Sequence, residues 1–152
     1  ILGRIMELRS RRKTQKPVLL KISPDLNEQQ LDETLEILER LKLDGIVATN
    51  TNVSRNNLKT AAKQIQAIGN GGMSGAPITA RSLEVVRYIH QKSEGKLPII
   101  AVGGIMSVED ALNMLDAGAS LIQLYTGFIY EGPGLARKIN RAIINRQTER
   151  QS

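Results

Sequence analysis

The sequence predicts an α/β fold of about four βα units, which corresponds to half of a (β/α)8 barrel. Four short apolar runs show no polar alternation, and amphipathic helical patterns separate them. Such runs are typical of parallel strands that are buried on both faces. Because a closed eight-stranded barrel needs about 250 residues, a chain of 152 residues is too short to close one. A flavodoxin-like open sheet is the structural alternative, and its outer strands would have to tolerate exposure.

The periodicity places these elements in a regular order. A basic helical lead-in is expected over residues 1–16, and the barrel segment over residues 17–152. The predicted strands cover residues 18–22, 45–49, 99–102 and 121–124. The predicted helices begin near Asn27, cover 79–91 and 108–115, and follow Pro133. The segment between the second strand and the second helix, rich in Asn, Lys and Gly, is predicted to be a polar loop.

Composition excludes several classes of protein. A hydrophobic fraction of 41% and a charged fraction of 24% are ordinary for a soluble globular domain. The absence of cysteine excludes disulfides, thiolate zinc sites and a cysteine nucleophile. The single histidine, His90, leaves little for a metal site or for a Ser/His/Asp triad. Neither a membrane-spanning run nor the apolar region of a signal peptide is present, so we expect this chain to be soluble.

The formal net charge of +6 comes largely from the two ends of the chain. The basic residues there are Arg4, Arg9, Arg11, Arg12, Lys13, Lys16, Arg137, Lys138, Arg141, Arg146 and Arg150. Aromatic residues make up only 3% of the chain, and no recognition motif accompanies the charge. We therefore expect solvated helix faces and no nucleic-acid partner.

Two glycines between a strand and a helix predict a site for an anion. Gly103 and Gly104 follow the strand at 99–102, where glycine lets backbone N–H groups approach an anion with no Cβ in the way. Ser107 then begins a helix, with Asp110 three residues later at the spacing of a capping box.

The last predicted strand ends at the same edge of the sheet. It is followed by Tyr125 and Thr126. Because the carboxyl ends of neighbouring parallel strands lie side by side, these residues join the two glycines. Together they predict a phosphate-binding site on a β/α barrel.

Polar residues also follow the first two strands. Lys21 is a lone cation near the end of an apolar strand, and such a cation is costly to bury unless it meets an anion or a polarised carbonyl. The alternative is a surface lysine whose stem alone is buried. Thr49, Asn50 and Thr51 are neutral donors and acceptors suited to the amide-like edges of a heterocycle, although Asn and Thr are also common in turns.

A glycine-rich loop, GGMSGAP at residues 71–77, runs into the second predicted helix. It contains Ser74 and Gly75. Such a loop is either a flexible connector or a further set of backbone donors over a cofactor.

Five segments in order closely resemble the C-terminal half of dihydroorotate dehydrogenase of the quinone-linked class 2: KISPDL, TNTNVSR, GGMSGAP, IIAVGGIMSVEDA and AGASLIQLYTG. The resemblance covers nearly all of residues 17–146. Tyr125 before Thr126 favours class 2 over the soluble class 1 enzymes. In that family the fold is a (β/α)8 barrel that binds FMN at the C-terminal ends of the strands, so the resemblance implies the C-terminal half of such a barrel.

The resemblance also implies roles for individual residues. Lys21 would lie beside the isoalloxazine ring and stabilise the anionic reduced flavin. Thr49 would contact the flavin, while Asn50 and Thr51 would hold the pyrimidine of dihydroorotate. The remaining FMN contacts would come from Ser74 and Gly75 through their backbone, and at the phosphate from Gly103, Gly104, Tyr125 and Thr126.

The resemblance implies an enzyme in the full-length protein. It would oxidise dihydroorotate to orotate in UMP biosynthesis, pass electrons through FMN to a quinone, and lie at the periphery of a quinone-carrying membrane. The serine base of the family belongs to an N-terminal half absent from these residues, so we expect no catalytic residue in this chain. No metal is implied. One departure is Asn52, where the family usually has a second threonine.

Two rival hypotheses remain at this point. Another FMN barrel, such as a dihydropyrimidine or dihydrouridine reductase, would share the phosphate site. Alternatively, the isolated chain is an inactive half-barrel that binds phosphate or self-associates. A four-stranded half-barrel has two free strand edges and an apolar inner face, so it should pair with the missing half or with a second copy.

Overall fold

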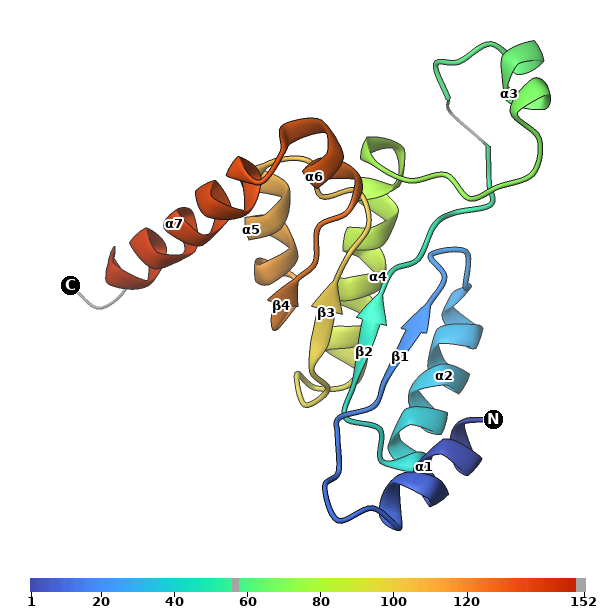
Figure 1. Cartoon of the computed structure of the whole chain (residues 1–152), viewed down its shortest axis with the longest axis vertical. Helices are drawn as coiled ribbons and strands as arrows, with labels where there is room; N and C mark the ends of the chain where they lie inside the picture. The colour runs from blue at the N-terminus through green and yellow to red at the C-terminus, as the bar shows by residue number, and fades with distance from the viewer. Residues whose placement is uncertain (56–57, 150–152) are drawn as a thin grey trace.

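The computed structural model describes residues 1–55 and 58–149, and these form a four-stranded parallel sheet with helices packed against it (Figure 1). Arg150 and the rest of the predicted segment beyond residue 149 lie outside the described residues. The strands are β1 (Leu19–Ile22), β2 (Gly45–Ala48), β3 (Ile99–Ala101) and β4 (Leu121–Ile122). All four predicted strands are therefore confirmed, each slightly shorter than expected.

The strands pair in chain order, β1-β2-β3-β4, and every neighbouring pair is parallel. A flavodoxin-like sheet requires a reversal in strand order, so that alternative is wrong. The strands are connected through the helices α2 (Glu28–Leu41), α4 (Thr79–Lys92) and α5 (Val108–Asp116). Figure 1 shows these helices packed along one side of the sheet. The arrangement is a series of βα units in which each strand lies beside the next strand in the sequence.

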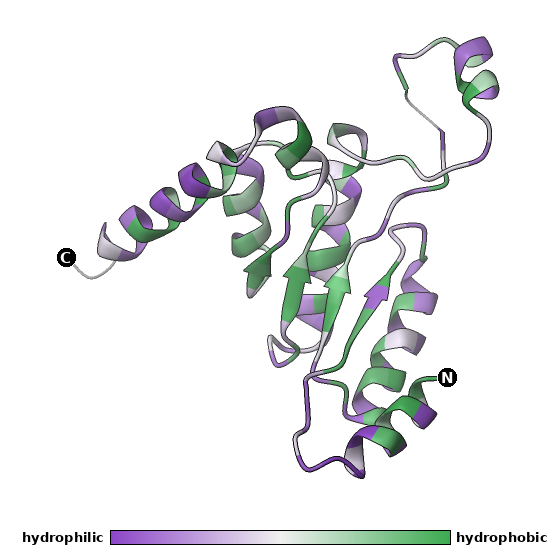
Figure 2. Cartoon of the chain, in the orientation of Figure 1, coloured by the Kyte–Doolittle hydropathy of each residue, from purple (hydrophilic) through white to green (hydrophobic). Residues whose placement is uncertain are grey.

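The two faces of the sheet differ in burial. Ile46, Ile99 and Ala101 point toward the helices and are fully buried with α4 residues such as Val85 and Ile89. The strands and the inward sides of the helices form the apolar part of the molecule (Figure 2). On the opposite face, four residues lie side by side across the strands: Lys21, Val47, Ile100 and Leu121. The two at the edges of the sheet, Lys21 and Leu121, are exposed. One face is thus a helix-covered core and the other is open.

Helix α2 begins as predicted, because Asn27 caps it. The Asn27 side chain accepts a hydrogen bond from the Gln30 backbone N–H at 2.9 Å, and the Gln30 side chain accepts from the Asn27 N–H at 3.0 Å. This reciprocal capping box satisfies backbone donors that the first helical turn leaves unpaired. Leu31 and Leu38 then lie one above the other on the buried side of the helix.

Several elements were not predicted, or only in part. The lead-in forms a helix only over α1 (Leu2–Ser10), and the predicted polar loop contains α3 (Ala62–Ile68) and the short 3-10 turn η1 (Ala76–Ile78). Neither α1 nor α3 has a buried residue, so no apolar stripe marks their limits. A short helix, α6 (Thr126–Glu131), precedes the expected last helix, α7 (Gly134–Glu149). Six residues are too few to show a helical period.

An ion pair ties α1 to the end of the sheet at which the strands begin. Both terminal nitrogens of Arg9 lie within 2.9 Å of carboxylate oxygens of Asp44, just before β2. The Asp44 carboxylate also accepts a hydrogen bond from the Val18 N–H, just before β1, at 2.6 Å. The hydrogen bond from the Val18 N–H, and to a smaller extent the one from Arg9, holds the pKa of Asp44 below its usual value. Asp44 therefore joins three segments that are distant in sequence.

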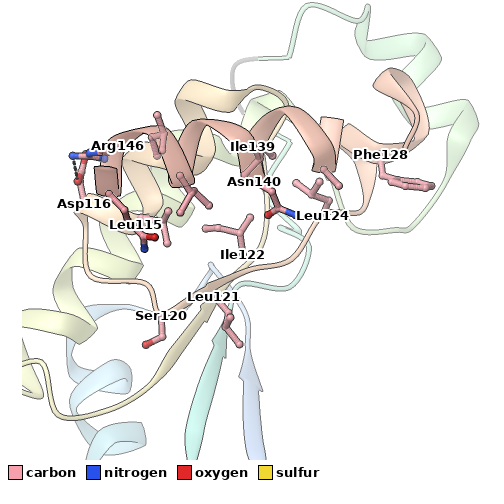
Figure 3. Close-up of a pocket in the computed structure, with 14 residues that line it drawn as sticks. Leu115, Asp116, Ser120, Leu121, Ile122, Leu124, Phe128, Ile139, Asn140 and Arg146 are labelled. Carbon is pink, nitrogen blue, oxygen red and sulfur yellow. Dashed lines mark hydrogen bonds and ion pairs between the residues drawn. The ribbon is translucent and has the colours of Figure 1, made fainter. Parts of the chain in front are cut away.

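Strand β4 lies at the edge of the described sheet, beside an open groove (Figure 3). This edge groove has a volume of about 670 Å³. It is lined by Leu112, Leu115, Asp116, Ser120, Leu121, Ile122, Leu124, Phe128, Ala136, Ile139, Asn140, Ile143, Arg146 and Gln147. Its lining is mostly apolar, and the Arg146–Asp116 ion pair at 2.5 Å closes the end farthest from Phe128. Leu121 is 61% exposed, so the sheet is open on this side within the described residues.

Asn27→Ala should destabilise the fold by about 1 kcal/mol, because the first turn of α2 loses its cap. The free energy of unfolding from denaturant titration measures the change. Glu36→Ala, at an exposed position on the same helix, serves as the control and should stay within about 0.5 kcal/mol of the parent chain. Equal losses from the two substitutions would contradict a capping role for Asn27.

Asp44→Asn should make the stability of the chain less sensitive to acid. Because the pKa of Asp44 is lowered in the folded state, its ionised form stabilises the fold above the unfolded value near 3.8. That stabilisation is lost as the pH falls through the lower, folded value. Denaturant midpoints at pH 7 and pH 3 should therefore differ less in Asp44→Asn than in the parent chain.

The control for the acid measurement is Leu38→Ala. It should cost about 2–5 kcal/mol at both pH values, because it removes packing and no charge. Parallel pH profiles for Asp44→Asn and the parent chain would show that this carboxylate does not contribute to acid sensitivity.

Candidate functional site

All of the predicted site residues line one cavity of about 310 Å³ at the C-terminal ends of the strands. They are Lys21, Thr49, Asn50, Thr51, Ser74, Gly75, Gly103, Gly104, Tyr125 and Thr126. We call this the strand-end cavity. Its lining also includes five residues that the sequence analysis did not single out, Ile78, Val102, Ile105, Gln123 and Gly127. Gln123 could have been found, because it follows exposed Leu121 at a spacing of two on the same face of the last strand.

Lys21 lies on the open face of the sheet, in register with Val47. Its side chain is exposed. No carboxylate among residues 1–55 and 58–149 forms an ion pair with it. The ammonium group is therefore a positive charge at the wall of the strand-end cavity that has no ion-pair partner among the described residues. That it meets an anion or a polarised carbonyl of a ligand stays a prediction.

The three residues after β2 divide between the core and the cavity. Thr49 is buried, and its hydroxyl oxygen lies 2.9 Å from that of Ser82 in α4. Asn50 and Thr51 are exposed. The Asn50 N–H donates to the Ile22 carbonyl at 2.7 Å, which fixes the backbone at this point. The side chains of Asn50 and Thr51 are thus available for a ligand, whereas the Thr49 hydroxyl is already hydrogen bonded.

The glycines after β3 let the backbone approach the cavity closely. Gly103 has φ +107, and a Cβ there would lie 2.7 Å from the Ser82 hydroxyl and 2.8 Å from the Thr49 hydroxyl. Gly104 has φ +75, and a Cβ there would lie 2.4 Å from the Thr79 backbone. Only glycine fits both the backbone conformation and the space at these positions. These two residues form the floor of the cavity.

The glycine-rich loop and α6 meet across the cavity. The Thr126 hydroxyl donates a hydrogen bond to the Ser74 hydroxyl at 3.0 Å. A Cβ at Gly75 would lie 3.0 Å from the Thr126 side chain, so the two segments are in close contact. Two residues predicted for cofactor binding from separate motifs are therefore direct neighbours.

The start of α5 is satisfied by its own residues. The Ser107 hydroxyl accepts from the Asp110 N–H at 3.0 Å, and the Asp110 carboxylate accepts from the Met106 N–H at 3.0 Å. The predicted capping by Ser107 is thus confirmed. The Asp110 carboxylate therefore already occupies this helix end.

The segment after Thr51 leaves the sheet and returns to it. Asn52 and Met73 exchange backbone hydrogen bonds of 3.0 and 2.7 Å, which close the loop that carries α3. The Asn52 side chain accepts from the Ser54 N–H at 2.5 Å and does not line the strand-end cavity. The departure at Asn52 therefore affects a turn and leaves the cavity wall unchanged.

An exposed apolar patch adjoins the cavity at α6. It consists of Tyr125, Phe128, Ile129 and Tyr130. Tyr125 belongs to both the patch and the cavity lining. In a short segment these residues show no period, so no sequence pattern groups them.

The described part of the chain contains neither a metal-binding cluster nor a membrane-spanning helix. No group of three or more His, Cys, Asp or Glu side chains is placed to hold a metal ion. No helix there is long and apolar enough to cross a membrane.

The fold and the site define one part of a β/α barrel that has a glycine-lined cavity at the C-terminal ends of its strands. The chain belongs to the dihydroorotate dehydrogenase family, because the sequence model of that family matches residues 3–146. The predicted family and the predicted α/β class are both confirmed.

Curated relatives agree with this assignment. A "Dihydroorotate dehydrogenase (quinone)" of Christiangramia forsetii is 48% identical over 146 residues, which cover 96% of this chain and 42% of that protein. A protein of the same name from Synechococcus sp. (strain JA-3-3Ab) is 48% identical over 141 residues, covering 90% of this chain and 37% of that protein. The chain thus spans about two fifths of the length of these relatives.

A solved structure supports the fold. The crystal structure of Eimeria tenella DHODH in complex with ferulenol superposes with a TM-score of 0.80 and 31% sequence identity. The match covers 93% of this chain and 37% of that chain. The half-barrel fold expected from the sequence is therefore confirmed as part of a larger family fold.

Gly103→Ala should destabilise the chain by about 2 kcal/mol, because the new Cβ meets two buried hydroxyls at an unfavourable φ. Gly134→Ala is the control, since a Cβ there meets nothing within 4 Å. It begins a helix, where alanine is preferred, and should be neutral or slightly stabilising. Thermal unfolding compares the two, and equal midpoints would contradict the tight floor.

Proposed function

We propose that the protein to which this chain belongs is a quinone-linked dihydroorotate dehydrogenase that uses FMN to oxidise dihydroorotate to orotate in UMP biosynthesis. The observation that carries the proposal is the strand-end cavity, in which residues from all the predicted motifs meet. Family membership favours this function over another FMN barrel that acts on dihydropyrimidines or dihydrouridine.

The residues at the cavity floor fit the phosphate of FMN. Gly103 and Gly104 offer backbone without a Cβ, and Thr126 adds a hydroxyl from the neighbouring strand end. In β/α barrels, phosphate groups are commonly held by the loops after the last two strands and a short extra helix. In the proposed enzyme, β3, β4 and α6 would occupy those positions. Tyr125 also lines the cavity, and Ser74 and Gly75 supply a second loop that contacts Thr126.

Lys21 fits the flavin ring. It is a free cation on the open sheet face, at the cavity wall. Bound FMN would supply the acceptor for the hydride from the substrate. A fixed ammonium beside the ring stabilises negative charge that develops there, because the charge is already in place and needs no reorganisation. Thr49 would contribute through its backbone, since its hydroxyl is bonded to Ser82.

Asn50 and Thr51 fit the pyrimidine substrate. A carboxamide donates and accepts at once, which matches the alternating N–H and C=O groups of a dihydropyrimidine ring. Both side chains are exposed at the cavity, next to a backbone fixed by the Ile22 carbonyl. We propose that these two residues orient dihydroorotate against the flavin.

The rest of the enzyme would come from the part of the relatives that this chain does not match. The base that removes the substrate proton is expected there, and this chain supplies no catalytic residue of its own. We propose that the N-terminal half pairs with the free edges of β1 and β4 and covers the edge groove. The apolar patch of α6 offers a surface beside the cavity for the quinone, in a protein that lies at the periphery of a quinone-carrying membrane.

A second candidate concerns the isolated chain. The exposed inner face of the sheet and the apolar edge groove favour association with a second copy when the other half is absent. Such an assembly could bind phosphate at the glycine floor without oxidising dihydroorotate. Anaerobic addition of dihydroorotate separates the two candidates, because only the complete enzyme should bleach the flavin absorption band.

Lys21→Ala in the full-length protein should reduce turnover by about 10²-fold and weaken FMN retention, because a preorganised charge is removed. Steady-state kinetics and the flavin content of the purified protein measure both effects. Lys96→Ala removes an exposed lysine of a surface ion pair and should leave both unchanged. Unaltered turnover in Lys21→Ala would remove Lys21 from the proposed mechanism.

A further inference from the structure

Two polar side chains are buried in the otherwise apolar core of the described residues, and they contact each other. Thr49 is 1% exposed and Ser82 is 0% exposed. Their hydroxyl oxygens are 2.9 Å apart. A buried hydroxyl is costly unless it is hydrogen bonded, so each satisfies the other.

The hydroxyl pair also reaches the backbone of the site. The Thr49 hydroxyl lies 3.1 Å from the carbonyl oxygen of Asn50 and 3.4 Å from that of Val102. Two hydroxyls carry two protons. Both protons are used when the Ser82 hydroxyl donates to the Thr49 hydroxyl and the Thr49 hydroxyl donates to the Asn50 carbonyl. A chain of hydrogen bonds then runs from α4 to Asn50, which is proposed to hold the substrate.

The same pair supports the glycine floor. A Cβ on Gly103 would lie within 2.8 Å of both hydroxyl oxygens, so the Gly103 backbone rests directly on them. The Thr49 N–H donates to the Val102 carbonyl at 2.5 Å, which joins this segment to the residue before Gly103. Ser82 therefore contacts Thr49, which precedes the proposed substrate residue Asn50, and it also packs against Gly103 of the glycine floor.

The rest of α4 shows that the hydroxyl is a local feature. The other buried residues of this helix are apolar, namely Val85, Val86 and Ile89. They pack in the core away from the cavity, whose lining includes none of them. An apolar pair of the same shape could fill the space at 49 and 82 with little loss of stability. Among the buried residues of α4, only Ser82, which lies next to the strand-end cavity, has a hydroxyl group that forms a directional hydrogen bond.

We propose that Ser82 is a positioning residue that acts through Thr49 to set the distance between Asn50 and Gly103. It touches neither substrate nor cofactor. The inference rests on the proposed function, because the segments that it positions are those proposed for dihydroorotate and for FMN. Without the Ser82 hydroxyl, Thr49 loses a donor and a small void opens below Gly103, so both segments can shift.

The test compares Ser82→Ala with Val85→Ala in the full-length protein. Ser82→Ala should raise the dissociation constant for FMN and the KM for dihydroorotate by about tenfold each, with a smaller change in kcat. Val85→Ala should lower the thermal midpoint at least as much, yet leave the FMN dissociation constant within about twofold, because it changes core packing alone.

Two further measurements exclude a general loss of structure. In the apo protein, Ser82→Ala should accelerate amide hydrogen exchange at Thr49 and Asn50 by at least about tenfold, and leave exchange at Ile46 in the middle of β2 unchanged. In the background of Thr49→Val, adding Ser82→Ala should change FMN binding less than about twofold, because the partner hydroxyl is already gone.

The proposal is overturned if Ser82→Ala changes FMN binding less than threefold, or if Val85→Ala changes it as much. Failure of the proposed function is recognised separately, since the wild-type protein would then neither retain FMN nor be reduced by dihydroorotate. In that case the exchange rates at Thr49 and Asn50 alone decide whether Ser82 positions this segment.

Discussion

The site depends on the hydrogen bonding of four parallel strands in chain order. Because every strand runs in the same direction, residues that follow the strands are delivered to one edge of the sheet. Lys21 and Thr126 are far apart in sequence but line the same cavity for this reason. The register also places Lys21 level with Val47, Ile100 and Leu121 on the neighbouring strands. Without the hydrogen bonds between the strands, the loops alone would not hold the residues of the cavity together.

The two faces of the sheet carry different tasks. Toward the helices the strands present small and branched apolar side chains that are fully buried, and this packing supplies the stability. Toward the other side they present a lysine, a glutamine and partly buried aliphatic residues. Thr49 is the point at which the two faces meet, because its backbone belongs to the site while its hydroxyl reaches into the core. The order of the site is thereby linked to the packing of α4.

The strands and the main helices could be predicted because each carries a continuous signal: an apolar run, a 3.6-residue period, or a cap such as Asn27. Most of the site residues could be grouped because they lie at or just after the ends of strands, whereas Ser74 and Gly75 were added from the glycine-rich loop. The helices α3 and α6 could not be found, because they are short and α3 has no buried residue. The direction of the Thr49 side chain depends on Ser82, a contact across 33 positions that no local pattern encodes. A free strand edge was expected from the sequence, but the lining of the groove beside β4 by α7 residues depends on tertiary packing.

The ion pair between Arg9 and Asp44 lies at the beginning of the strands, whereas the cavity lies at their other end. This separation matters for protein engineering and for evolution. Substitutions among the residues near Asp44 can raise or lower thermal tolerance while the geometry around the proposed flavin stays the same, because the partners of Asp44, Arg9 and Val18, do not line the cavity and distant sites without shared partners act independently. A lineage adapting to a warmer or colder habitat could therefore adjust one end of this barrel without compromising the chemistry at the other.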